Sequence, residues 1–219
     1  MDGSTNNPAA GKPARPRGRP KVSSDEDKRA QIVDAARKIF VEHGYAGTTT
    51  ALVARVCNVS KQTLYKLFTS KEDLFTAVVV AHRKMMLDLP RAEEENLSVS
   101  DALQSIFMID INEAEDDERA TFIQLVMRES GQFLELREVL HNEGMIKSRQ
   151  MLAEWLSSQQ ERGKLSIDDA DSGARMLMDM IFGGMGPPEG RSQAWPDRQA
   201  RRHHLQRCLS IFARGVGAK

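Results

Sequence analysis

The side chains best suited to chemistry in this chain are polar residues along a short helix predicted to begin at Lys61. The apolar residues of this segment recur at helical spacing and are expected to face inward, which leaves a polar outer face. Such a face matches base edges in a major groove, because glutamine can pair with adenine, lysine donates to guanine, and threonine or tyrosine reaches phosphate. The outer face consists of Lys61, Gln62, Thr63, Tyr65 and Lys66.

A short helix and the turn that follows it would position this face. Residues 51–56 form a small apolar helix, and Asn58 then interrupts it, because asparagine tolerates a left-handed backbone. The Ser60 hydroxyl can accept a bond from a free amide of the next turn and so restart a helix. Two short helices joined by a tight turn are typical of a helix-turn-helix, the arrangement that places its second helix in a major groove.

Flanking helices are predicted on both sides of this pair. Ser24 followed by Asp27 reads as a capping box that opens a helix with one apolar face, and Gly44 ends that helix. A second capping box begins at Ser70, and the helix that it opens runs until Pro90. This later helix would connect the polar reading face to the rest of the molecule.

The segment from Lys28 to Phe75 resembles the N-terminal domain of the TetR/AcrR family of bacterial transcription regulators. The resemblance rests on the His43-Gly44-Tyr45 turn, the pair Thr48-Thr49, Val59-Ser60-Lys61, Thr63-Leu64-Tyr65 with Phe68, and Ser70-Lys71-Glu72. Asn58 stands where the family usually has glycine, which keeps the turn because both residues visit the left-handed region. The resemblance implies that Thr49, Lys61, Gln62, Thr63, Tyr65 and Lys71 contact DNA.

Charge is distributed unevenly although the formal net charge is +0. Residues 1–75 contain 13 Lys and Arg against 8 Asp and Glu, a net of +5, and the remainder carries −5. A basic end on an acidic body would direct a polyanion to one end of the molecule.

Other classes of protein find no support in the sequence. Cys57 and Cys208 have no paired spacing, the five histidines are dispersed, and no phosphate loop or nucleophile elbow is present. We therefore expect no metal, no cofactor and no enzymatic activity. No apolar stretch approaches the ~20 residues of a membrane span, and free cysteines suit the reducing cytoplasm.

Residues 1–24 are predicted to form a flexible basic arm, because they contain few large apolar side chains. Within it, RPRGRPK resembles an AT-hook, in which Arg17 and Arg19 would enter a narrow minor groove and Gly18 would let the backbone approach. The alternative is a basic tail that adds affinity without reading sequence. Both versions contact DNA.

The rest of the chain shows only helical patterning, so the predicted fold class is all-α. Domains are expected at 25–75, a helix-turn-helix domain, and 76–219, a helical domain for effector binding and dimerisation. The stretch EAEDDE at 113–118 reads as an acidic link, and a long helix is expected from about Glu135 to Gln160.

The last two helices are the candidates for a dimer interface, because the first of them is apolar on more than one side. The resemblance implies that these helices pair with those of a second subunit. The alternative is that the apolar residues of these helices only close the core of the monomer. The predicted interface residues are Ala174, Leu177, Ile181, Leu205, Leu209 and Phe212.

The resemblance also implies a cavity for a small effector molecule in the helical domain. Its predicted lining is Met86, Phe107, Phe122, Met127, Trp155 and Met176, although residues of these types are also ordinary core residues. The sequence thus predicts a homodimeric, ligand-responsive transcription regulator, a repressor released from a palindromic double-stranded DNA operator. The alternative is an architectural protein of A·T-rich DNA without an effector.

Overall fold

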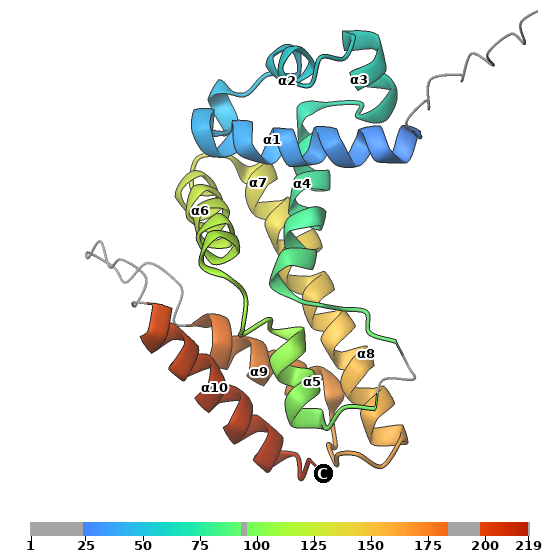
Figure 1. The fold of residues 1–219 in the computed structure, drawn as a ribbon, viewed down its shortest axis with the longest axis vertical. Coiled ribbons are helices and arrows are strands. Elements are labelled where there is room, and N and C mark those ends of the chain that lie inside the picture. Colours follow the sequence, from blue (N-terminus) through green and yellow to red (C-terminus); the bar gives the residue numbers. More distant parts are fainter. Residues whose placement is uncertain (1–23, 93–95, 184–197, 219) are drawn as a thin grey trace, which may run out of the picture.

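The computed structural model describes residues 24–92, 96–183 and 198–218, and within these ranges every regular element is a helix. Figure 1 shows an elongated molecule with α1 to α3 at one end, which we call the head, and α5, α9 and α10 at the other. The helix α4 runs from the head into the rest of the molecule. Because every regular element of the described residues is a helix, the predicted all-α class is confirmed.

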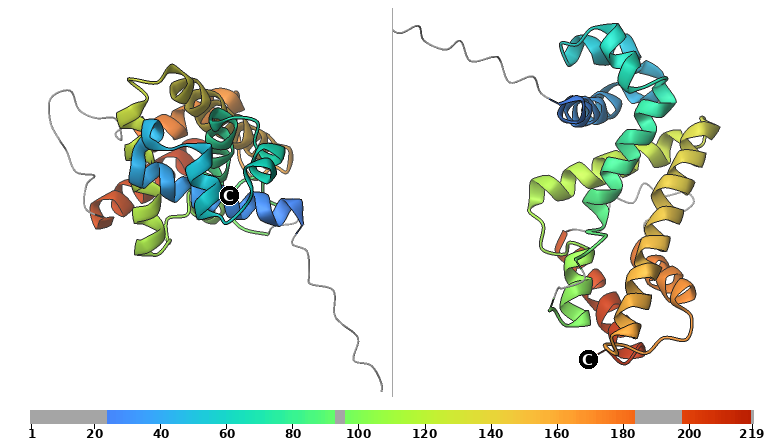
Figure 2. Two further views of the ribbon diagram at one scale, coloured as in Figure 1. Left: turned by 90° about the horizontal axis from the view of Figure 1, so that it is seen from above. Right: turned by 90° about the vertical axis from the view of Figure 1, so that its right-hand side faces the viewer.

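The head is formed by three helices, and α4 leaves it. Their bounds are α1 Asp25–Gly47, α2 Thr50–Val56, α3 Lys61–Leu67 and α4 Lys71–Met86. The body contains α5 Val99–Ile106, α6 Glu113–Glu129, α7 Leu134–Val139, the π-helical turn η1 Leu140–Ile146, α8 Lys147–Glu161, α9 Ala170–Phe182 and α10 Arg198–Gly215. The right-hand view of Figure 2 shows that the head and the C-terminal end lie at opposite ends of the molecule.

Side-chain caps begin most of these helices where the sequence places them. Ser24 and Asp27 form the predicted capping box of α1. Ser70 accepts the amide of Asp73 at 3.1 Å, but the carboxylate of Asp73 accepts the amide of Thr69 rather than that of Ser70, so the second box is only half formed. Gly44 ends the regular part of α1 with φ 70° and ψ 173°, as expected.

Three predicted boundaries differ from the structure. The acidic stretch 113–118 opens α6 instead of linking helices, because carboxylates near a helix N-terminus are stabilised by its dipole. The helix α4 ends at Met86, before Pro90. The predicted long helix is continuous from α7 to α8 but contains the π-helical turn η1, which the periodicity did not indicate.

Two hydrophobic cores hold the molecule together, and they do not follow the order of the chain. The head core takes in α1 to α4 and also Phe122 and Leu125 of α6. In it Phe75 lies edge-on to both Phe40 and Tyr45, with ring centroids 5.2 and 5.4 Å apart. The second core joins α5, α8, α9 and α10. The helix α6 therefore belongs to the body in sequence and to the head in packing.

None of the helices in the described ranges combines the length and the apolarity that crossing a bilayer requires.

Candidate nucleic-acid interface

One side of the helix α3 packs into the head core, and the opposite side is exposed to solvent. Leu64 and Phe68 are fully buried in the head core. Ser60 caps the helix by accepting the amide of Thr63 at 3.0 Å, as predicted. Because the buried residues fix the rotation of α3, its opposite side, including Lys61 and Gln62, faces solvent.

The polar residues of this outer face divide into free and engaged side chains. Lys61 and Gln62 are exposed and have no hydrogen-bond partner within the described part of the chain. The Thr63 hydroxyl lies 2.8 Å from that of Ser60, and the Tyr65 hydroxyl 3.0 Å from that of Thr50. The free amide and ammonium groups are therefore available to a ligand, while Thr63 and Tyr65 are held in position.

Both predicted lysines at the edges of this face already have partners. Lys66 donates to the carboxylate of Asp25 at 2.7 Å, and this hydrogen bond lowers the pKa of Asp25. Lys71 donates to the carbonyl of Tyr45 at 3.0 Å and lies 4.0 Å above the centre of its ring. A phosphate would have to compete with these contacts, although an exposed pair such as Lys66 with Asp25 is weak.

Thr49 lies next to α3 at the start of α2. Its hydroxyl accepts the amide of Leu52 at 3.1 Å, and the residue is exposed. The pairing of Thr50 with Tyr65 ties α2 to α3 across this surface. Sequence analysis did not indicate Thr50, because a hydroxyl pair between two helices leaves no periodic signal.

A carboxylate from the body supports the turn that leads into α2. Glu129, at the end of α6, accepts the amide of Tyr45 at 2.6 Å and is 14% exposed. A Cβ added to Gly44 would lie 2.7 Å from Oε1 of Glu129. The turn between α1 and α2 therefore packs directly against this carboxylate. A displacement of α6 would move or break the contact and so alter the turn in the head.

Charged side chains also lie on the buried face of α6 closer to its start. Arg37 of α1 pairs with Glu118, and Arg119 donates from Nε to the carbonyl of Met85 at the end of α4. Asp116 pairs with Arg201 of α10. Sequence analysis missed these contacts, although charged residues within the apolar stripe of α6 were the signal that could have revealed them.

His82 of α4 lies among these groups. It is 6% exposed, its ring lies 4.6 Å from that of Phe122, and neither ring nitrogen has a hydrogen-bond partner in the described structure. Burial, together with the charges of Arg37 and Arg119, lowers the pKa of His82 to about 3. The imidazole is therefore neutral at physiological pH.

The six predicted effector-pocket residues do not meet in one place. Met86 and Phe107 line a cavity of about 30 Å³ with Arg119 and Arg201. Phe122 belongs to the head core and Trp155 to the second core. Met127 and Met176 are 42% and 59% exposed, because each lies on the outer side of its helix.

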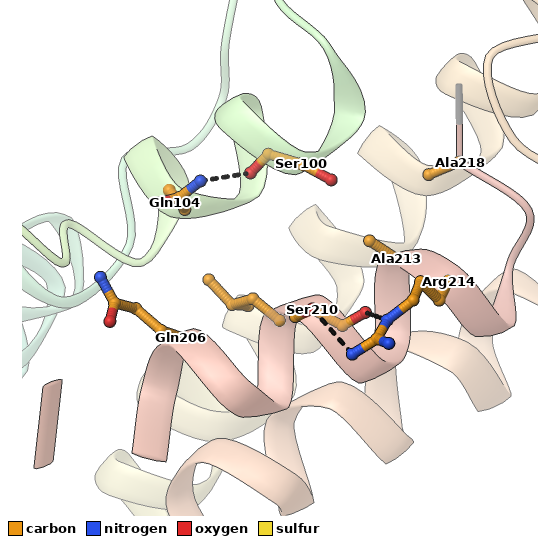
Figure 3. Close-up of a pocket in the computed structure, with 8 residues that line it drawn as sticks. Ser100, Gln104, Gln206, Ser210, Ala213, Arg214 and Ala218 are labelled. Atoms are coloured by element: carbon orange, nitrogen blue, oxygen red, sulfur yellow. Dashed lines mark hydrogen bonds between the residues drawn. The ribbon is translucent and has the colours of Figure 1, made fainter. Parts of the chain in front are cut away.

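A larger hollow of about 310 Å³ lies between α5 and α10, on the surface of the body (Figure 3). Gln104 and Ser100 border it from α5, while Gln206, Ser210 and Arg214 border it from α10. Arg214 is turned back onto its own helix, where its Nη2 donates to the hydroxyl of Ser210 at 3.1 Å. Sequence analysis indicated none of these residues.

The predicted interface residues are buried within the protomer. The reason is that α9 and α10 turn their apolar stripes toward α5 and α8, which the periodicity alone could not specify. Their exposed fractions are 0% for Ala174, 0% for Leu177, 2% for Ile181, 8% for Leu205, 3% for Leu209 and 7% for Phe212.

The predicted AT-hook residues Arg17, Gly18 and Arg19 lie outside the described residues.

Two known protein-family domains match the N-terminal and the C-terminal part of the chain. The N-terminal domain of the tetR family of bacterial regulatory proteins matches residues 32–78. The C-terminal domain of AefR-like transcriptional repressors matches residues 101–215, which is more than half of the chain.

Individual relatives agree with these matches. The transcriptional regulator UidR of Escherichia coli K12 is 26% identical over 76% of this chain and 84% of its own. The solved structure of Salmonella enterica GusR aligns over 90% of this chain and all of its own, with a TM-score of 0.64 and 21% identity. A TetR-family regulator from Mesorhizobium loti aligns over 89% and 98%, with a TM-score of 0.62 and 20% identity.

Proposed function

The chain belongs to the TetR family of DNA-binding transcriptional regulators, and we propose that it is a homodimeric repressor that a small molecule releases from a palindromic operator. The observation that carries the DNA-reading part is the outer face of α3, on which Lys61 and Gln62 stand exposed with unoccupied polar groups. A helix seated on a buried Leu64 and Phe68 presents these groups rigidly. Preformed donors of this kind suit base edges in a major groove.

Base reading is assigned to Lys61 and Gln62, and positioning to their neighbours. Thr49, Thr63 and Tyr65 would reach phosphates from the rim of the same face, and Lys66 and Lys71 would do so after leaving their present partners. Contacts to phosphate fix the register of a protein on the duplex, whereas contacts to bases specify sequence. The unequal distribution of charge supports this orientation, since residues 1–75 carry a net charge of +5.

A second subunit is proposed to pack on the outer side of the seam between α9 and α10. The seam is marked by Cys208 of α10, whose thiol contacts the carbonyl of Met180 at 3.3 Å. Met176 lies one turn before Met180, and Ile211 lies one turn after Cys208, so both flank this seam. Each is more than half exposed, at 59% and 51%, because the inner sides of the two helices already fill the core.

Release by an effector requires a path from the body to the head. Two contacts of α6 supply it: Glu129 with the amide of Tyr45, and Arg119 with the carbonyl of Met85. A ligand that favours another position of α6 would favour another orientation of the heads and so weaken operator binding. Half-sites about one helical turn apart make affinity sensitive to this orientation.

Selection of the purified protein on a random duplex library at physiological salt tests the proposal. We expect one inverted repeat to be enriched. Diffuse enrichment of A·T-rich duplexes without dyad symmetry would instead support the architectural alternative. The basic arm would serve both functions, so its deletion does not discriminate between them.

Single substitutions then test the assigned roles. Gln62→Ala and Lys61→Ala should each weaken binding to the selected operator by about 1 to 3 kcal/mol and binding to random duplex much less, because a base contact is lost. Lys84→Ala is the matched control, since Lys84 is an exposed lysine in the last turn of α4, away from the head. Equal losses on operator and random DNA would mean that the two residues contact only phosphate.

A further inference from the structure

The small cavity at the junction of α4, α5, α6, α9 and α10 combines apolar walls with two guanidinium groups. Met86, Phe107, Ile123 and Phe182 contribute to its walls, and Arg119 and Arg201 supply the charges. Its volume of about 30 Å³ corresponds to roughly one water molecule. A larger ligand would have to displace Met86 and Phe182, both of which are only half-buried.

Arg119 is a buried cation that forms no ion pair with any carboxylate of the described residues. It is 7% exposed, and its Nε and Nη2 donate to the carbonyl of Met85 and to the sulfur of Met108. Within the described residues no carboxylate oxygen lies close enough to form an ion pair with it. Burial lowers the pKa of Arg119 to about 10, so the side chain remains charged at neutral pH. An uncompensated buried charge is costly and is commonly paired with a counter-ion.

The carboxylates of Asp116 and Glu115 act on Arg119 electrostatically, but neither forms an ion pair with it. Arg201 forms an ion pair with Asp116, and these two charges offset each other. His82, one turn before Met86 on α4, is neutral because burial holds its pKa far below the physiological range. No carboxylate of the described residues thus forms an ion pair with Arg119, and an anion entering the cavity would do so.

We propose that the effector is an amphipathic organic carboxylate, whose carboxylate pairs with Arg119 and whose apolar part replaces Met86 and Phe182 against Phe107. This inference rests on the proposed function and adds to it the chemical class of the effector. A guanidinium matches a carboxylate with two parallel hydrogen bonds, which a carbonyl and a thioether cannot offer.

The same pairing explains how the ligand would act on the head. Arg119 now holds the carbonyl of Met85, in the last turn of α4. A carboxylate is a stronger acceptor and would draw the guanidinium away from this carbonyl. The end of α4 would lose its tie to α6, and α4 begins at the head beside α3. Ligand binding would thus weaken one of the contacts that hold the end of α4 in its present position.

The test compares acids with their uncharged amides on the wild-type full-length protein. Calorimetric titration at pH 7 would use phenylacetate, naphthalene-1-acetate and decanoate, each beside its primary amide, with inorganic phosphate as an anion that has no apolar part. We expect at least one acid to bind at least tenfold more tightly than both its amide and phosphate. No preference for acid over amide in any pair would overturn the proposal, and so would tightest binding of phosphate.

Variants locate the site of this preference. Arg119→Met keeps a long side chain without the charge and should remove the preference, while Arg119→Lys should retain part of it. Arg202→Met is the matched control, because Arg202 lies on the same helix as Arg201, is 52% exposed and pairs with Asp110 outside the cavity. A preference that survives Arg119→Met, or that Arg202→Met removes, would refute the assignment. If Arg119→Met does not fold, the Arg119→Lys variant and the comparison of acids with amides on the wild-type protein still test the pairing of the carboxylate with Arg119.

Failure here is distinguishable from failure of the proposed function. Operator binding without ligand tests the regulator, and acid binding without DNA tests the effector class. A protein that binds its operator but shows no acid preference overturns only the inference about the effector. A protein that prefers acids but selects no inverted repeat overturns the proposed function.

Discussion

Replacing Gly44 with alanine should destabilise the head and identify the contact that joins it to the body. Gly44 has φ 70° and ψ 173°, a backbone conformation that is essentially restricted to glycine. The new Cβ would also lie 2.7 Å from Oε1 of Glu129, closer than real Cβ contacts. Glu129 must then move, although its Oε2 accepts the amide of Tyr45 at 2.6 Å.

The size of the effect follows from these two sources. Backbone strain of this kind is worth about 1 to 3 kcal/mol. Loss of the charged acceptor leaves the buried amide of Tyr45 without a partner, which adds about 1 to 2 kcal/mol. We therefore expect the free energy of unfolding to fall by about 2 to 5 kcal/mol in Gly44→Ala.

A double-mutant cycle separates the two sources. Glu129→Ala removes the carboxylate that the new methyl group meets, so only the backbone strain of Gly44→Ala should remain in that background. The double variant should accordingly lose about 1 to 2 kcal/mol less than the sum of the single variants, because the acceptor of the Tyr45 amide is then lost only once. Strict additivity would mean that the methyl group and the carboxylate do not interact.

The assay is denaturant unfolding at one fixed protein concentration, because the apparent stability of an oligomer depends on concentration. Gly47→Ala is the matched control, since its Cβ would meet only the Cβ of His43 at 3.5 Å, an ordinary contact. It should change stability by less than about 0.5 kcal/mol. A Gly44→Ala variant as stable as Gly47→Ala would refute the reasoning.

Two further predictions concern the buried histidine and the proposed subunit contact. The folded-state pKa of His82 is about 3, below its ordinary value of 6.5, so the unfolded chain binds the extra proton and stability falls as pH drops below 6.5. The free energy of unfolding should therefore decrease between pH 7 and 5 by about 2 kcal/mol less in His82→Phe than in the wild-type protein. An equal decrease in both proteins, measured by denaturant unfolding, would contradict this. Ile211→Glu should give folded monomers in light scattering, whereas Leu177→Glu should unfold the protomer because Leu177 is fully buried; a folded dimer of Ile211→Glu would exclude the proposed face.

The helix-turn-helix was predictable because its signals are local. The Ser60 cap, the left-handed Asn58 and the burial of Leu64 act within one or two turns of chain, and the structure contains all three. Periodicity also indicated that α9 and α10 are amphipathic. It could not show what their apolar stripes would contact, and so the predicted interface residues lie in the core of the protomer.

The residues that line the small cavity were harder to predict for a related reason. An aromatic or methionine residue at helical spacing has the same pattern whether it lines a cavity, fills a core or lies at the surface. Phe107, Phe122 and Met127 occupy these three environments in turn. Only the tertiary packing of the helices distinguishes these environments.

The sequence by itself determined most of the helices, several of their caps and the polar outer face of α3, because hydrogen bonding and side-chain periodicity act between near neighbours. The tertiary structure decided which buried charges meet. Arg119 reaches a carbonyl 34 residues away, and Glu129 an amide 84 residues away. Such pairs depend on how α6 lies across α1 and α4, a choice made by the whole core and not by any segment of the chain.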